Sequence, residues 1–217
     1  PMSEGVFRIA DKRPARDGMT ISRNTGLGTK TGVSFFSLGK NTSISRESYD
    51  STAIYIAAEG KGDFIVGEPS VRCEMIEGSV LIVPPATLCG MESGEGIIYT
   101  EIITDKEIVM NSAVKAGEVM KLNDLIPYEE GSIANLDIAS NSSMKFVLMS
   151  FDEGTGLQPH RAPGNAIIFA LEGKAVIGYE GKDYPIEAGE NFRFEKNGLH
   201  SVTADGKFKM ALLLVLE

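Results

Sequence analysis

The sequence predicts an all-β protein built from two similar domains. Three observations lead to this prediction: short apolar runs rich in β-branched and aromatic residues, turn residues spaced regularly between these runs, and an internal repeat. The length of 217 residues fits two small domains, since single domains most often have about 100–150 residues.

The repeat pairs turn residues and apolar residues that lie 113 positions apart, and 111 positions apart after a two-residue adjustment. Glycine and proline recur at matched positions where two chains share the same backbone turns. We therefore expect two homologous domains, residues 5–104 and 118–217, joined by residues 105–117. The matched residues are Asp11 and Asp124, Pro14 and Pro127, Gly18 and Gly131, Ala53 and Ala166, Gly60 and Gly173, Gly78 and Gly189, and Leu88 and Leu199.

The expected strands alternate with turns such as Glu59-Gly60 and Glu172-Gly173. Many short strands at regular spacing are typical of a sandwich or a barrel. The segment 123–130 is a modest helical candidate, and we expect a short turn there. The strand candidates are Val33–Leu38, Ala53–Ala57, Phe64–Val66, Val80–Val83 and Ile97–Ile103 in the first half, and Lys145–Phe151, Ala166–Leu171, Ala175–Tyr179, Asn191–Phe194 and Lys207–Val215 in the second.

Composition excludes several classes of protein. The chain has 30 acidic and 21 basic residues, a formal net charge of −9, and no large basic patch, so neither nucleic acid nor an anionic membrane surface is an expected partner. Its apolar runs are shorter than the roughly 20 residues that a membrane-spanning helix needs. Two cysteines are too few for a disulfide-rich scaffold or a cysteine-rich metal protein. Pro1 before Met2 is taken as a trimmed start, no secretory signal pattern follows, and we expect a cytoplasmic protein with reduced thiols.

The stretch 156–202 resembles the cupin superfamily, whose first motif has the pattern H-x-H, a glutamate and a glycine, and whose second motif ends in a histidine. His160 falls on the first histidine of motif one, and His200 falls on the histidine of motif two. Ala162 stands at the position of the second histidine, and Ala166 at that of the glutamate. The two histidines of the chain therefore coincide with two ligand positions of the family.

The rest of the pattern is degenerate. Glu195 and Asn197 replace the proline and glycine of motif two. In the first half, Glu47 and Tyr49 stand at the two histidine positions of motif one, and Cys89 at the histidine of motif two.

The resemblance implies a small antiparallel barrel in each half, so that the chain would be a bicupin: two tandem cupin-type double-stranded β-helix barrels of jelly-roll type. Members of the family use the barrel-facing histidines and carboxylate to hold Mn, Fe, Ni or Zn. The resemblance thus predicts one divalent transition metal (Zn, Ni, Mn or Fe) at His160 and His200. The alternative is that both histidines line the barrel without any metal.

Two imidazoles are fewer than the three protein ligands that a catalytic zinc site typically has. Gln158 lies two residues before His160, so regular strand alternation would place both side chains on one face. Glu195 is the other candidate for an additional ligand. Arg161 should point away from His160, as a rim residue that meets an anionic ligand or as a solvated charge.

The leading hypothesis is a small-molecule-binding protein whose pocket lies in the C-terminal barrel, with Gln158, His160, Arg161 and His200 as ligand-binding residues. The competing hypothesis is a metal-dependent enzyme, an isomerase or dioxygenase, with an unorthodox ligand set. Alanine at position 166 argues against oxygen activation and acid–base chemistry, because both need an anionic or titratable partner. A purely structural or regulatory protein is the third possibility.

The first half is expected to be a structural half, although Glu47 and Cys89 could bind a soft metal. By analogy with single-domain relatives, the chain is expected to be a monomer or a homodimer. The sequence leaves open which ligand binds, whether a metal is present and whether the protein is catalytic.

Overall fold

The computed structural model describes residues 5–217; Pro1 and Met2 lie outside the described residues. The described chain contains seventeen β-strands, one short α-helix and one turn of 3₁₀ helix. The prediction of an all-β fold is confirmed. No helix within residues 5–217 is long and apolar enough to cross a membrane.

The chain divides into two compact units, each described here by itself. The N-terminal unit consists of Ile9–Ile108 and Ser112–Lys121. The C-terminal unit consists of the described residues up to Arg8, Val109–Asn111 and Leu122–Glu217.

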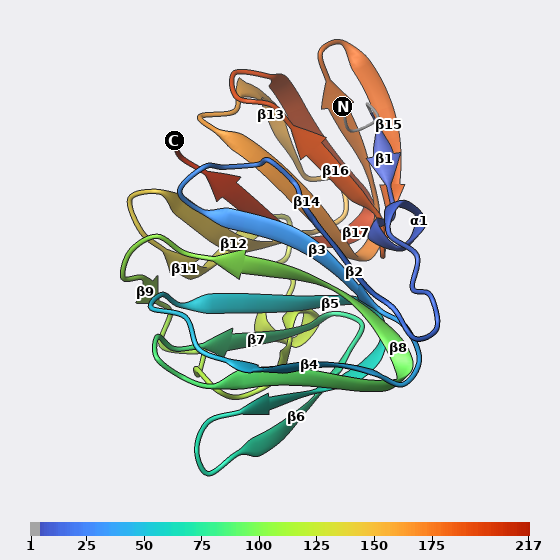
Figure 1. Cartoon of the computed structure of the whole chain (residues 1–217). Coiled ribbons are helices and arrows are strands. Elements are labelled where there is room, and N and C mark those ends of the chain that lie inside the picture. The colour runs from blue at the N-terminus through green and yellow to red at the C-terminus, as the bar shows by residue number, and fades with distance from the viewer. Residues whose placement is uncertain (1–4) are drawn as a thin grey trace. The chain divides into compact units, whose positions relative to one another are not determined.

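The N-terminal unit is an eight-stranded antiparallel sheet with the order β10-β7-β5-β8-β3-β2, in which β4 pairs with β8 and β6 with β5 (Figure 1). The helical turn α1 (Ile9–Lys12) opens this unit. Its strands are β2 (Thr20–Asn24), β3 (Gly32–Leu38), β4 (Thr42–Glu47), β5 (Ala53–Val66), β6 (Val71–Ile76), β7 (Ser79–Val83), β8 (Cys89–Ile103) and β10 (Met120–Lys121).

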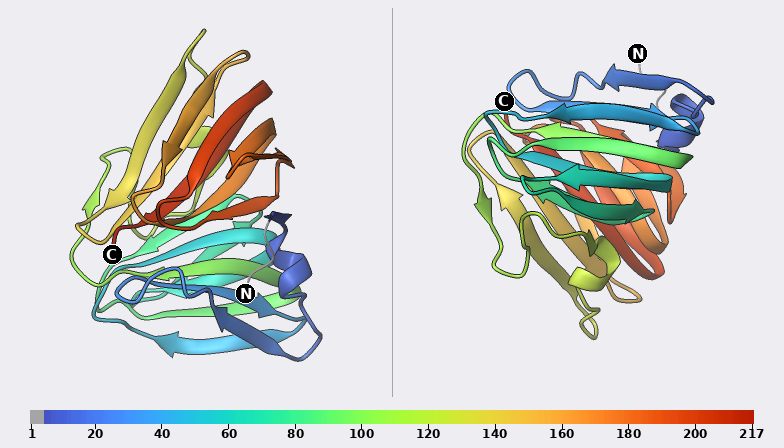
Figure 2. Two further views of the ribbon diagram at one scale, coloured as in Figure 1. Left: turned by 90° about the horizontal axis from the view of Figure 1, so that it is seen from above. Right: turned by 60° about the horizontal axis from the view of Figure 1, so that its bottom comes forward.

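The C-terminal unit is a nine-stranded sheet with the order β1-β16-β14-β17-β12-β11-β9, in which β13 pairs with β17 and β15 with β14. The long strands β14 and β17 run side by side through its centre (Figure 2). The 3₁₀ helix η1 (Leu122–Leu125) is the short turn expected near residue 123. The strands are β1 (Val6–Phe7), β9 (Val109–Met110), β11 (Ile133–Ser140), β12 (Met144–Phe151), β13 (Gly156–Arg161), β14 (Asn165–Tyr179), β15 (Lys182–Glu187), β16 (Asn191–Phe194) and β17 (Leu199–Val215).

The two sheets repeat one strand order, but each takes its first strand from the other half of the sequence. β10 lies at the edge of the N-terminal sheet beside β7, and β1 takes the equivalent place beside β16. In both halves a turn of helix, α1 or η1, follows directly or after one residue. The chain therefore passes between the units more often than a simple division into two consecutive segments would require.

Several predicted runs merge into single long strands. β5 contains both Ala53–Ala57 and Phe64–Val66, and β14 likewise contains two of the predicted runs. Each long strand bends at a matched glycine, Gly60 or Gly173, where the backbone has φ of +79° and +75°. A Cβ atom at either glycine would overlap a carbonyl oxygen of the neighbouring strand. Glycine is thus required at the bend by both conformation and space.

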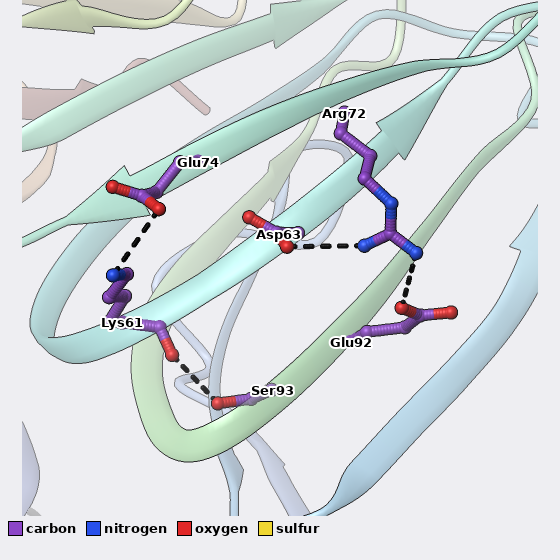
Figure 3. Close-up of polar contacts among 6 residues, drawn as sticks. All are labelled: Lys61, Asp63, Arg72, Glu74, Glu92 and Ser93. Carbon is purple, nitrogen blue, oxygen red and sulfur yellow. Dashed lines mark hydrogen bonds and ion pairs between the residues drawn. The ribbon is translucent and has the colours of Figure 1, made fainter.

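The apolar residues of each unit face the core that its curved sheet encloses. In the N-terminal unit Tyr55, Phe64 and Tyr99 are sealed from solvent, and in the C-terminal unit Phe192 and Phe208 are. The outer surface carries ion pairs instead. Figure 3 shows one such network on β5, β6 and β8, with exposed side chains whose pairs contribute little to stability: Arg72–Asp63 (3.1 Å), Arg72–Glu92 (2.7 Å) and Lys61–Glu74 (3.4 Å).

Candidate functional site

His160 and His200 face each other across the strand pair β13–β17. They are direct register partners, and their ring centroids lie 4.1 Å apart at an interplanar angle of 56°. His200 and Val202 are two residues apart on β17, so their side chains lie on the same face of the strand. Val202 is part of the apolar interior, and His200 therefore also points inward. The structure therefore brings together the two residues that the motif singled out.

The hydrogen bonds of both rings fix which nitrogen is available. Nδ1 of His160 lies 2.9 Å from the carbonyl oxygen of Gln158, and Nδ1 of His200 lies 3.1 Å from that of Gly198. A carbonyl oxygen only accepts, so each Nδ1 carries the proton. In the neutral ring each Nε2 then keeps its lone pair, free to accept a hydrogen bond or to ligate a metal ion.

Burial keeps His200 in this neutral form. Desolvation lowers the pKa of His200, and the charge of a protonated His160 lowers it further, while the hydrogen bond to Gly198 acts in the opposite direction. The ring of Phe194 stacks on His200 at 4.1 Å and 25°, which holds the imidazole in place. At neutral pH His200 is therefore an acceptor.

The remaining ligand positions of the cupin pattern are apolar. Ala162 and Ala166 are each 2% exposed and belong to the apolar interior. Within residues 5–217 no group of three or more His, Cys, Asp or Glu side chains is arranged to hold a metal ion. The residues present do not make a complete protein-ligated metal centre, because two imidazoles lack the third ligand.

The register of β13 bears on the predicted position of Gln158, whose role in ligand binding stays a prediction. The register of β13 against β17 shifts between Leu157 and His160, so one extra residue lies on β13. Such a bulge breaks the alternation of side chains, and a spacing of two no longer places Gln158 and His160 on one face. The observed contribution of Gln158 is its main-chain carbonyl, which binds Nδ1 of His160.

Arg161 and Glu195 make contacts of their own. Arg161 is exposed, and its guanidinium donates a hydrogen bond of 2.8 Å to the carbonyl of Asn197. Glu195 forms an ion pair of 3.0 Å with Nε of Arg193. Both side chains are thus engaged near the barrel mouth, and a role for either in ligand binding stays a prediction.

A groove of about 320 Å³ lies elsewhere in the C-terminal unit. It is lined along β14 and β15 by Lys174, Val176, Pro185 and Glu187, with Asp205 from β17. None of its lining residues is one of the four predicted site residues. Its walls mix exposed charges of both signs, which does not indicate one ligand class.

In the N-terminal unit the same register places Glu47 opposite Cys89. The strand pair β4–β8 even repeats the bulge of β13–β17, here between Ile44 and Glu47. Burial raises the pKa of the Cys89 thiol to about 12, so the thiol stays protonated at neutral pH. A neutral thiol is a poor metal ligand, which argues against the soft-metal alternative for Glu47 and Cys89.

Sequence reasoning missed one functional candidate in this unit, the buried Glu101. It lies on β8 within the run Ile97–Ile103, is 9% exposed, and accepts a hydrogen bond of 3.1 Å from the hydroxyl of Tyr55. A carboxylate inside an apolar strand is the signal that could have found it, because charged side chains are almost never buried without a partner.

The C-terminal unit is similar in sequence to a known protein family. Residues 147–216 match the family model described as a cupin domain. The match supports a cupin domain in the C-terminal unit, and the solved structures below share its fold. A search of the curated proteins found no significant match.

Three solved structures illustrate the shared cupin fold. A cupin 2 conserved barrel domain protein from Leptotrichia buccalis is 22% identical, with a TM-score of 0.86 and coverage of 97% of this chain and 95% of that one. Salicylate 1,2-dioxygenase from Pseudaminobacter salicylatoxidans is 13% identical (TM-score 0.68; coverage 98% and 84%). Oxalate decarboxylase from Bacillus subtilis is 12% identical (TM-score 0.58; coverage 99% and 78%). At these identities the likeness concerns the fold alone.

Proposed function

We propose that this protein is a bicupin that binds a small molecule at the mouth of its C-terminal barrel, beside His160 and His200. The bicupin assignment is supported by the strand order common to the two sheets and by the matched bulges of β4–β8 and β13–β17. The observation that carries the binding proposal is the tautomer of the two rings, because both Nδ1 atoms are occupied by main-chain carbonyls and both Nε2 atoms are free.

The surroundings of the rings define the class of ligand. Ala162, Ala166 and Phe194 make the adjoining interior apolar, and no described carboxylate completes a metal site with the two rings. A buried acceptor on His200, with the exposed ring of His160 beside it, favours a mainly apolar molecule that carries a hydrogen-bond donor, such as a hydroxyl group. A ligand of this kind would satisfy an Nε2 acceptor and would bury its apolar body against the alanines.

Phenol and anisole provide a matched test of this proposal. Both have the same ring, but only phenol can donate a hydrogen bond to Nε2. We expect phenol to raise the melting temperature of the full chain and to shift the imidazole signals of His160 and His200 in NMR spectra, and anisole to do neither. The variant His160→Phe, which keeps an aromatic ring and loses both nitrogens, should lose the effect of phenol. Equal responses to the two compounds, or an unchanged response of the variant, would contradict the proposal.

The second candidate function is a metal-dependent enzyme, an isomerase or dioxygenase, in which a divalent ion (Zn, Ni, Mn or Fe) is held by the two Nε2 atoms and completed by water or substrate. Two free Nε2 atoms in one strand pair favour this candidate, and the oxalate decarboxylase neighbour is described with Mn(II) centres. Metal analysis of untagged protein, before and after incubation with each ion, distinguishes the candidates. A stoichiometric ion that is lost in both His160→Ala and His200→Ala would favour the enzyme, and its absence would favour the binding protein.

A further inference from the structure

A polar cluster that the proposed function does not use extends from the surface of the N-terminal unit to its buried interior. We call it the Glu101 cluster; it consists of Glu47, Tyr49, Tyr55, Cys89 and Glu101. Glu47 and Cys89 are register partners, and Tyr55 and Glu101 are partners on β5 and β8. Glu101 and Tyr99 are two residues apart on β8, so their side chains lie on the same face of the strand. Tyr99 belongs to the apolar core, and the carboxyl group of Glu101 therefore points into the barrel.

Glu101 is only partly satisfied. Its Oε2 accepts the hydrogen bond from Tyr55, whereas Oε1 receives none from the described residues. About nine-tenths of the surface of Glu101 is buried. Its Oε1 has no described hydrogen-bond partner but is not completely buried, so solvent reaches this atom. A buried carboxyl oxygen that lacks a partner but remains accessible is placed to receive a ligand.

Aromatic rings form a closed wall behind this carboxyl group. The rings of Tyr55 and Phe64 lie 4.8 Å apart, those of Phe64 and Tyr99 5.2 Å apart, and Phe36 stacks on Tyr99 at 5.2 Å. Tyr55, Phe64 and Tyr99 are at most 1% exposed, so solvent does not approach Glu101 through them.

Two partly exposed side chains, Tyr49 and Leu88, lie on the opposite side of the cluster. Tyr49 is 39% exposed and Leu88 is 36% exposed, whereas Cys89 beside them is 7% exposed. Burial raises the pKa of both Tyr49 and Cys89, and the charge of the nearby Glu101 raises both further. A small molecule can therefore reach Glu101 past an aromatic and an aliphatic side chain.

Acidic side chains make the electrostatic potential in the cluster negative. Glu47 and Glu101 both lie there, and Glu47 raises the pKa of Glu101 in addition to the effect of burial. The neighbouring guanidinium of Arg46 is turned to Glu68 (3.2 Å) and to the carbonyl of Gly67. The charge of Arg46 also acts on the cluster, since it opposes the burial that raises the pKa of Cys89, and its buried Nε has no hydrogen-bond partner in the described chain. Two acidic groups nevertheless face an anionic ligand there, and within residues 5–217 no set of three His, Cys, Asp or Glu side chains is arranged to hold a metal ion.

We propose that the Glu101 cluster binds a small organic cation that carries an ammonium group. The ammonium group would donate a hydrogen bond to Oε1 of Glu101 and would lie near Glu47, and the apolar part of the molecule would contact Tyr49 and Leu88. The ring of Tyr49 would also attract the positive charge. A bound cation favours the ionised form of Glu101 and so lowers its pKa, and binding therefore releases a proton at pH values between the pKa of the empty site and that of the occupied site.

n-Butylammonium, n-butanol and valerate are suitable probes, because they share an alkyl chain and differ in charge. In NMR titrations of the full chain, we expect only n-butylammonium to bind. Its affinity should rise with pH, by up to about tenfold per pH unit below the pKa of Glu101. Calorimetry in two buffers with different heats of ionisation should detect the released proton in the wild-type chain.

Glu101→Gln keeps the shape of the side chain and removes its charge, so it should weaken binding about tenfold or more and abolish the pH dependence. Glu95→Gln, on the same strand but exposed, makes the same change in net charge and should leave binding unchanged. His200→Ala should also leave it unchanged, which separates this site from the C-terminal one. Stronger binding of valerate or n-butanol, equal losses in the two glutamine variants, or no uptake or release of protons would overturn the proposal.

Discussion

The hydrogen bond between Tyr55 and Glu101 gives a quantitative prediction about the N-terminal unit. Tyr55→Phe removes one hydroxyl group and preserves the ring that packs on Phe64 and Tyr99. The lost hydroxyl donates to Oε2 of Glu101 over 3.1 Å, and both residues are buried. No other described group replaces this donor, so the whole cost falls on the carboxyl group.

The cost depends on the charge of Glu101. Burial raises the pKa of Glu101, and the bond from Tyr55 opposes this because it stabilises the ionised form. A group with a raised folded-state pKa contributes its full stability at low pH and loses it as the pH rises through that pKa. We expect Tyr55→Phe to cost about 1 kcal/mol where Glu101 is neutral and about 2–3 kcal/mol where it is ionised, since hydrogen bonds to charged groups are the stronger.

Both cysteines of the chain provide the assay. Cys73 and Cys89 are buried in the N-terminal unit, and the C-terminal unit has no cysteine. Pulses of a methanethiosulfonate reagent at increasing urea concentration therefore measure the unfolding of the N-terminal unit alone. The experiment is done at acidic and alkaline pH, in the wild-type and Glu101→Gln backgrounds. A cost that is the same at both pH values, or the same pH-dependent cost in the Glu101→Gln background, would refute the reasoning.

Three further predictions concern the C-terminal unit. Gly173→Ala should destabilise this unit by more than about 2 kcal/mol in urea unfolding, because the added Cβ would overlap a carbonyl oxygen at a residue with φ of +75°. Gly131 also has a positive φ but has open space around it, so Gly131→Ala should cost only about 1 kcal/mol. Similar costs for the two variants would contradict this explanation. Burial lowers the pKa of His200, so the contribution of this group to stability is full above the unfolded pKa of about 6.5 and is lost as the pH falls towards the folded-state pKa. His200→Phe should therefore flatten the dependence of the melting temperature on pH below about 6.5, and an unchanged slope would argue against this explanation. The double variant Ala162→His and Ala166→Glu restores the ligand types of the cupin pattern and should bind Zn²⁺ or Mn²⁺ more tightly than the wild type in dialysis; no gain would show that these positions do not face the rings.

Some features of the site were predictable because they depend on local chemistry and on spacing. His160 and His200 were found from a motif whose spacing encodes the geometry of a strand pair, and the structure places them as register partners. The predicted face of Gln158 depended on regular alternation, which a single extra residue in β13 removes. A bulge adds no distinctive residue to the sequence, so pattern reasoning had no means of locating it.

The sequence by itself determined the all-β fold, the repeat and the identity of the two histidines. Strands follow from β-branched runs, and turns follow from glycines such as Gly60 and Gly173, whose backbone conformation other residues rarely adopt. Only the tertiary structure decided which nitrogens of His160 and His200 are free and that Glu101 lies beside Tyr55. Tyr55 and Glu101 lie far apart in the chain, so burial and hydrogen bonding act on the pair only after the sheet has brought them together. The ring contacts of the two histidines are local, with carbonyls two residues away, but they depend on the backbone conformation that the strand pair imposes.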